Sequence, residues 1–129
     1  MNKWEVLQAY WERFGLLAFN EQTVPSHIPN ERGEMVPLVP PYITYEPVVG
    51  SLDGVIQGSA KVWYRGTSNK QVTDKVTEME PKVNAIMDFD GGKLKVRKPD
   101  EWARQAPADP TDEQTRAIIV NVLYEFLSL

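Results

Sequence analysis

Few residues of this chain have the types and spacing that enzyme chemistry needs. His27 is the only histidine and the chain contains no cysteine, so no second imidazole or thiolate can share a metal ion with it. No serine lies in a strand-turn-helix elbow between glycines, and no glycine-rich phosphate loop is followed by lysine and serine or threonine. We therefore predict that the protein is not an enzyme and needs no cofactor and no metal.

A second candidate for chemistry is the segment in which Asp88 and Asp90 precede Gly91 and Gly92, as in part of a calcium loop. Lys93 follows where such a loop needs another oxygen ligand. We interpret this segment as a turn between two elements, with the glycines at backbone positions of positive φ.

Length and charge limit the protein further. A chain of 129 residues without cysteine is long enough for one domain, spanning residues 1–129, whose core needs no disulfide. The formal net charge of −4 disfavours a protein whose main task is to grip nucleic acid through its phosphates. No segment has the apolar length of a membrane span or a signal peptide, so we expect neither secretion nor a membrane partner.

Hydrophobic periodicity predicts two helices. The first covers residues 3–18, begins after an N-cap at Asn2 and has an apolar stripe that includes Trp4 and Trp11. The second covers residues 69–87, and the apolar side chains of its stripe are Val72, Val76, Met79, Val83 and Ile86. Pro81 lies away from this stripe, where a kink in the helix is tolerated.

Four strands are predicted at residues 42–49, 55–65, 93–98 and 116–127, and the first two form a hairpin. The last strand is almost continuously apolar, which indicates a central place in the sheet. The order α-β-β-α-β-β predicts an α+β fold, with a mainly antiparallel four-stranded sheet and two helices packed on one face. The inward stripes predict a core that contains Val62, Val76, Val83, Val120, Val122 and Phe126.

Two proline-rich segments show neither helical nor strand periodicity. Residues 19–41 form too long a loop for a compact domain unless the loop is functional or disordered, and its aliphatic residues indicate an extended arm that docks on another surface. The alternative is an ordered loop packed on its own domain. Residues 99–115 form a long hairpin loop, and a basic strip from Lys93 to Arg104 faces an acidic run from Asp109 to Glu113 along the same hairpin. These opposite charges either pair neighbouring copies or belong to a solvated hairpin.

Two helices can cover only one face of a four-stranded sheet, so the other face should expose apolar side chains. That face carries Trp63 and Leu127, together with Ile43 and Tyr45 or with Tyr42, according to the register. A contiguous apolar patch usually marks a protein interface. We therefore predict a subunit interface that draws on this face and on the charged loop: Tyr45, Trp63, Arg97, Lys98, Trp102, Arg104, Asp109, Asp112, Ile119 and Leu123.

A series of short motifs over about two thirds of the chain resembles the neck proteins of long-tailed bacteriophages, of the tail-terminator or tail-completion type. They are a Pro-Tyr-Ile-Thr opening at residues 41–44, a Trp-Tyr-Arg strand end at 63–65 and an Asp-Gly-Gly turn at 90–92. A tryptophan-containing loop with an Asp-Pro step follows at 102–110, and a Tyr-Glu-Phe-Leu strand end at 124–127.

The resemblance implies a structural virion protein that forms a ring, often a hexamer, at the head-proximal end of the tail. Such a ring ends the growth of the tail tube and provides the head-tail joining surface. The implied partners are other copies of the chain, the tail tube protein and a head-completion or connector protein, while DNA passes through the ring without sequence-specific binding. The implied location is the virion neck, after assembly in the host cytoplasm.

Two alternatives stay open. The long proline-rich arm departs from the family pattern, so a head-completion or connector neck protein is one of them. The other, from a different class, is a small cytoplasmic ligand-binding or enzymatic α+β domain that uses a groove beneath the arm.

Overall fold

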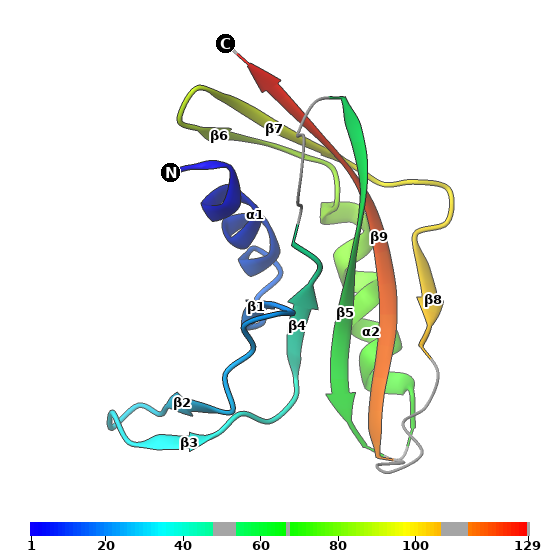
Figure 1. Cartoon of the computed structure of the whole chain (residues 1–129). Coiled ribbons are helices and arrows are strands. Elements are labelled where there is room, and N and C mark those ends of the chain that lie inside the picture. Colours follow the sequence, from blue (N-terminus) through cyan, green and yellow to red (C-terminus); the bar gives the residue numbers. More distant parts are fainter. Residues whose placement is uncertain (48–53, 67, 107–113, 129) are drawn as a thin grey trace.

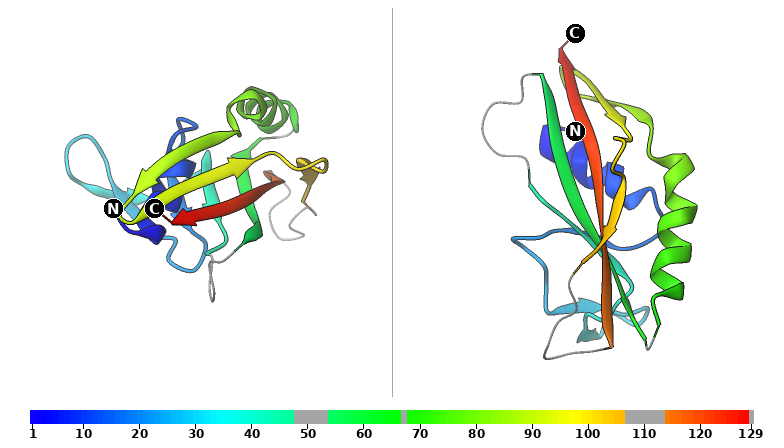
Figure 2. Two further views of the ribbon diagram at one scale, coloured as in Figure 1. Left: turned by 90° about the horizontal axis from the view of Figure 1, so that it is seen from above. Right: turned by 90° about the vertical axis from the view of Figure 1, so that its right-hand side faces the viewer.

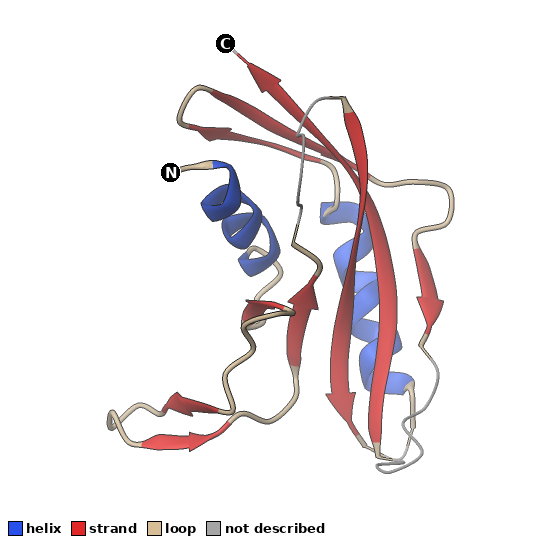
Figure 3. Cartoon of the chain, in the orientation of Figure 1, coloured by secondary structure: helices blue, strands red, loops and turns tan. Residues whose placement is uncertain are grey.

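The computed structural model describes residues 1–47, 54–66, 68–106 and 114–128. Strands make up most of the regular structure, and two short helices accompany them (Figure 3). The elements in chain order are α1 (Lys3–Glu12), β1 (Ala18–Asn20), β2 (His27–Pro29), β3 (Met35–Pro37), β4 (Tyr42–Tyr45), β5 (Val55–Arg65), α2 (Lys70–Met79), the 3-10 turn η1 (Glu80–Lys82), β6 (Ala85–Phe89), β7 (Gly92–Arg97), β8 (Ala103–Gln105) and β9 (Thr115–Ser128).

One curled sheet forms the body of the molecule (Figures 1 and 2). Its strands follow the order β1-β4-β5-β9-β7-β6, and β8 pairs with β9 beside this path. All of these pairs are antiparallel except β1 with β4, which is parallel. The long strands β5 and β9 pair along the whole of β5, from Val55 opposite Glu125 to Arg65 opposite Thr115. β9 thus has the central position that its apolar sequence predicted.

The predicted fold class, α+β with a four-stranded sheet and two helices on one face, is wrong. The described part of the chain is mainly β, and its main sheet has seven strands there. The sheet curls, and α1 contacts both β1 and β6 and lies in the opening between them (Figure 1). The unpredicted strands β1, β2, β3 and β8 have three residues each, which is too short for a period of two to show in the sequence.

The first helix begins as predicted and ends early. The side chain of Asn2 accepts a hydrogen bond of 2.8 Å from the backbone N–H of Glu5, whose carboxylate accepts one of 2.9 Å from the Asn2 N–H. This reciprocal capping box confirms the predicted N-cap. The helix ends at Glu12 rather than at residue 18, because Gly15 takes a positive φ of 82° and the chain then turns into β1.

The second predicted helix is wrong at its C-terminal end. The helix α2 stops at Met79, the turn η1 contains Pro81, and residues 85–89 form strand β6. Proline in a helix interior removes a backbone donor and clashes with the preceding turn, so Pro81 ends the helix instead of kinking it. After it, the alternation through Ile86 and Asp88 is that of a strand, and both of these side chains are exposed.

The core lies on the inner face of the curl, where both helices pack. All six residues predicted to be buried there are buried: Val62, Val76, Val83, Val120, Val122 and Phe126. An aromatic cluster joins α1 to the sheet, since the Trp11 Nε1–H donates a 2.8 Å hydrogen bond to the Tyr124 hydroxyl and the Trp11 ring stacks on Tyr45. The Tyr10 hydroxyl donates to the backbone oxygen of Val83 at 2.8 Å.

Two glycines make room for these contacts. A Cβ on Gly58 would lie 2.1 Å from Cε2 of Tyr124, so the absence of a side chain at Gly58 makes room for the tyrosine ring. A Cβ on Gly92 would lie 2.1 Å from the backbone oxygen of Leu127, so Gly92 serves the close approach of β7 to β9. Only Gly91, with a φ of 89°, takes the positive φ predicted for both turn glycines.

Candidate functional site

The register between β4 and β5 decides which side chains face outward. Ile43 pairs with Val62 and Tyr45 pairs with Ala60, and all four residues are buried on the inner face. Tyr42 pairs with Trp63 on the opposite, outer face. The alternative that the sequence left open is therefore resolved in favour of Tyr42.

An aromatic row crosses the outer face from β1 to β5. The ring centroids of Phe19 and Tyr42 lie 6.1 Å apart, and those of Tyr42 and Trp63 lie 6.4 Å apart. The Trp63 Nε1–H donates a 2.9 Å hydrogen bond to Oγ1 of Thr44, and Lys61 Nζ lies 5.6 Å from the Trp63 ring centroid. All three rings are half-buried, so other parts of the same chain already cover a share of their apolar surface.

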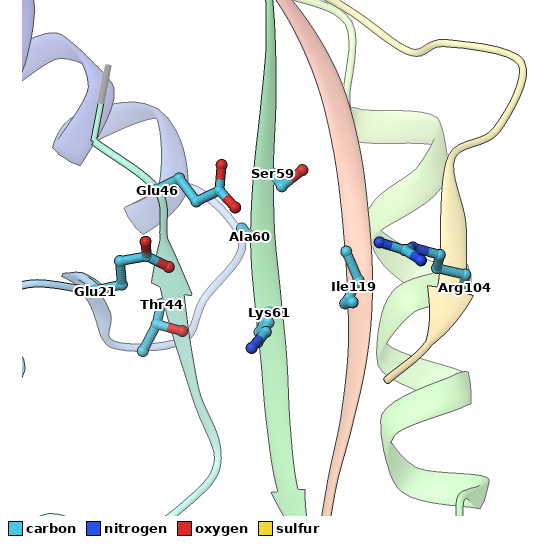
Figure 4. Close-up of a pocket in the computed structure, with 8 residues that line it drawn as sticks. All are labelled: Glu21, Thr44, Glu46, Ser59, Ala60, Lys61, Arg104 and Ile119. Carbon is cyan, nitrogen blue, oxygen red and sulfur yellow. The ribbon is translucent and has the colours of Figure 1, made fainter. Parts of the chain in front are cut away.

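A small hollow lies beside this row on the outer face (Figure 4). Its volume is about 70 Å³, and Figure 4 shows Glu21 and Glu46 on one side of β5, Lys61 on β5 itself and Arg104 reaching toward Ile119 from the other side. Acidic and basic side chains thus face one another across an exposed strip of sheet.

The hollow has little capacity for catalysis. The hydroxyl of its serine, Ser59, donates a 2.8 Å hydrogen bond to Oδ1 of Asn121, so its proton is directed at an amide oxygen rather than at a base. His27 lies in β2, outside the residues that line the hollow, with its Nδ1 3.0 Å from Oγ of Ser26. Pockets that enclose drug-sized ligands typically have volumes of about 300 to 1,000 Å³, several times the volume of this hollow.

Several predicted interface residues do share the outer face. Arg104 pairs with Ile119 between β8 and β9, and Arg97 pairs with Leu123 between β7 and β9. Lys61 pairs with Ile119, which joins this group to the strand that carries Trp63. Ile119 and Leu123 are half-buried, and the two arginines are exposed. The structure thus brings residues from four strands onto one surface.

Other predicted interface residues are placed elsewhere. The prediction that Tyr45 lies at the interface is wrong, because Tyr45 belongs to the core. It is 5% exposed and donates a hydrogen bond of 2.5 Å to Oε1 of Gln8. The prediction that Trp102 lies at the interface is wrong for the same reason, because Trp102 packs into the core and is 7% exposed. Its Nε1–H has no hydrogen-bond partner among the described residues. Lys98 is exposed, and its Nζ lies 2.8 Å from Oε1 of Glu80. Asp109 and Asp112 lie outside the described residues.

The segment predicted as an arm, residues 19–41, is ordered as a projecting ribbon. It starts within β1, and β2 and β3 then form a two-stranded antiparallel sheet separate from the main one (Figure 1). Met35 is 63% exposed and Val39 is 61% exposed. The predicted loop at residues 99–115 contains β8, which extends the sheet along β9.

Two surface residues were missed from the sequence. Phe19 lies in the aromatic row, and Ile86 is 65% exposed on β6. Ile86 was assigned to the apolar stripe of a helix, and the alternation of residues 85–89 was the available signal for a strand. The register of β4, which decides the place of Tyr42, had no signal in the sequence.

Comparison of the chain with protein-family models, with curated proteins and with solved structures found no match. Neither helix in the described part of the chain has the length and apolarity to cross a membrane.

Proposed function

We propose that the protein is a structural assembly subunit that forms a ring in the neck of a long-tailed phage, of the tail-terminator type. In this role the ring ends tail-tube growth, presents the surface to which the head joins and lets DNA pass. The proposal starts from the motif resemblance. The observation that carries it further is the β2–β3 ribbon, which projects from the body with apolar side chains exposed.

A projecting ribbon with exposed apolar side chains favours assembly, because in a single chain these side chains contribute no free energy of burial. Burial of apolar surface contributes roughly 25 cal/mol per Å², so an exposed methionine and valine on an extended ribbon leave that free energy unused until a partner covers them. The ribbon therefore supports a role in self-association or in docking on neighbouring proteins.

The motifs behind the resemblance fall on connected parts of one sheet. Residues 41–44 enter β4, residues 63–65 end β5, residues 90–92 form the turn into β7, and residues 124–127 lie near the end of β9. The charge of −4 fits a passage for DNA better than a grip on it, since an acidic wall repels phosphate.

The alternatives have less support. A head-completion or connector protein would use the same surfaces. The identity of the protein that the chain binds distinguishes this function from that of a terminator. A ligand-binding or enzymatic domain needs an enclosed pocket. The outer hollow measures about 70 Å³ and holds a serine whose hydroxyl is bonded to an amide, and a larger hollow of about 510 Å³ on β6 and β7 is shallow and open.

Negative-stain electron microscopy of the purified full chain, alone and mixed with phage tail tubes, tests the proposal. We expect closed rings with a central opening, or caps at one end of the tubes. Single particles without rings, together with tubes that stay uncapped at a large molar excess of the chain, would contradict it.

A further inference from the structure

The edges of the β2–β3 ribbon are poorly suited to pairing with a further strand. The N–H of Leu38 donates to the oxygen of Ser26 at 2.9 Å, and the N–H of Asn30 donates to the oxygen of Glu34 at 2.8 Å. Because hydrogen-bonded pairs alternate along an antiparallel ribbon, the backbone groups of Pro29 and Pro37 point outward from its two edges. Proline has no N–H, so each edge lacks a donor that a further strand would need.

The same alternation gives the ribbon one exposed face. The exposed side chains on it are His27, Pro29, Met35 and Pro37. Met35 is the largest apolar group among them, and methionine adapts to irregular apolar surfaces. The two prolines restrict the backbone, which lowers the entropy lost on docking.

A shallow hollow of mixed apolar and basic lining lies on β6 and β7, at the other end of the molecule. Its volume is about 510 Å³, and it is lined by Asn84, Ala85, Ile86, Lys95, Val96 and Arg97. The side chain of Ile86 is 65% exposed there, so nothing in the described chain covers it. β6 is the last strand of the sheet.

Charge favours the ribbon as the occupant of this hollow. The tip of the ribbon carries Glu31 and Glu34 with one arginine, Arg32, so its net charge is negative. The hollow carries Lys95 and Arg97, for which no ion pair is found among the described residues. Opposite potentials of this kind set register and partner choice at protein interfaces.

The ribbon of one chain cannot fill the hollow of the same chain. Figure 1 shows the ribbon projecting from the end near β1 and β4, while β6 and β7 lie at the opposite end, with α1 between them. A ribbon that fills this hollow therefore comes from another copy. A contact between two different surfaces of identical chains is heterologous, and repeated contacts of this kind close into a ring when the rotation allows it.

We propose that the exposed face of the β2–β3 ribbon docks in the β6–β7 hollow of the next copy, with Met35 against Ile86 and the acidic tip near Arg97. This inference rests on the proposed ring function and names the contact that holds the ring together.

The absence of native cysteine allows a direct test by disulfide crosslinking. Chains carrying Met35→Cys are mixed with chains carrying Ile86→Cys and oxidised, and the control mixture replaces the second chain with Leu17→Cys, whose position is 51% exposed. We expect the Met35→Cys and Ile86→Cys mixture to give at least about tenfold more mixed disulfide dimer than the control. Equal yields from the two mixtures would overturn the proposed contact.

A charge exchange provides an independent readout by sedimentation. Arg97→Glu should weaken self-association about tenfold, and Glu34→Arg in the same chain should restore it. Self-association that is unchanged in Arg97→Glu and in Ile86→Asp, while the wild type forms an oligomer, would overturn the contact and leave the ring function standing. A wild type that stays monomeric at every concentration, with no rings or caps on tail tubes, would contradict both.

Discussion

The indole Nε1–H of Trp11 donates a hydrogen bond of 2.8 Å to the hydroxyl of Tyr124, across 113 positions of sequence. Both side chains are fully buried, and Tyr124 lies on the central strand β9. This contact holds α1 in the opening of the curled sheet, so it links the shape of the sheet to the first helix of the chain.

Trp11→Phe should lower the free energy of unfolding by about 2 to 3 kcal/mol, because it removes buried surface and leaves the Tyr124 hydroxyl without its donor. Urea denaturation measures the change. Trp4→Phe is the matched control, since Trp4 is 56% exposed on the same helix, and it should change stability by less than about 0.5 kcal/mol. Equal losses in the two variants would show that the buried hydrogen bond does not anchor α1.

Gly58→Ala should destabilise the protein by about 1 to 3 kcal/mol. The new methyl group would lie 2.1 Å from the Tyr124 ring, which is held in place by Trp11 and cannot move freely. At Gly66 the nearest atom to such a methyl is Oε1 of Gln71 at 3.7 Å, so Gly66→Ala serves as the control. Thermal unfolding of both variants is the measurement, and a Gly58→Ala variant as stable as Gly66→Ala would contradict the close packing of the ring.

Alkaline pH should unfold the protein through its buried tyrosines. Burial raises the pKa of Tyr124 and of Tyr10 above the usual value of about 10. The folded chain therefore keeps these protons at a pH where the unfolded chain loses them, and stability is full below pH of about 10 and falls above it. Each group should contribute a slope of about 1.4 kcal/mol per pH unit there.

Urea midpoints between pH 8 and pH 11.5, followed with tyrosinate absorbance, check this dependence. Tyr124→Phe removes one titrating group and should give a shallower fall than the wild type, whatever its stability at pH 8. Tyrosine ionisation completed before any loss of structure would contradict the burial of these hydroxyls.

Trp63→Glu tests the outer face as a contact surface. Trp63 stands in the aromatic row, and aromatic side chains are common anchors at interfaces, so we expect the variant to stay folded and to associate about tenfold more weakly. Val55→Glu is the control, because Val55 is 51% exposed at the other end of the same strand face. Light scattering at matched concentrations compares them, and equal association in all three proteins would remove the Trp63 surface from the interface.

The sequence allowed the long elements to be predicted and left the shape of the sheet unresolved. β5 shows clear alternation over many residues, β9 is apolar over almost its whole length, and the N-cap Asn2 has a local signal. β1 and β8 have three residues each, and they form because longer strands offer them an edge to pair with. That preference is tertiary and leaves no period in the sequence.

The same distinction applies to the candidate site. Trp63, Ile119 and Leu123 could be placed on one face because their strands are long. Tyr45 and Trp102 could not, since the burial of Tyr45 depends on the pairing register with Ala60 and that of Trp102 on the path of a loop. Met35 was noticed only as part of an aliphatic segment, because a projecting ribbon and a packed loop have the same composition.

The mass of the purified full chain in solution shows whether copies of the chain assemble into a closed ring. Sedimentation velocity and native mass spectrometry over a wide concentration range should show one dominant closed oligomer, and a hexamer would have six times the chain mass of 14.7 kDa. Its population should rise with concentration without larger open species, because a ring that closes leaves no free contact surface. A chain that remains a monomer throughout, in the absence and in the presence of tail tubes, would contradict the account.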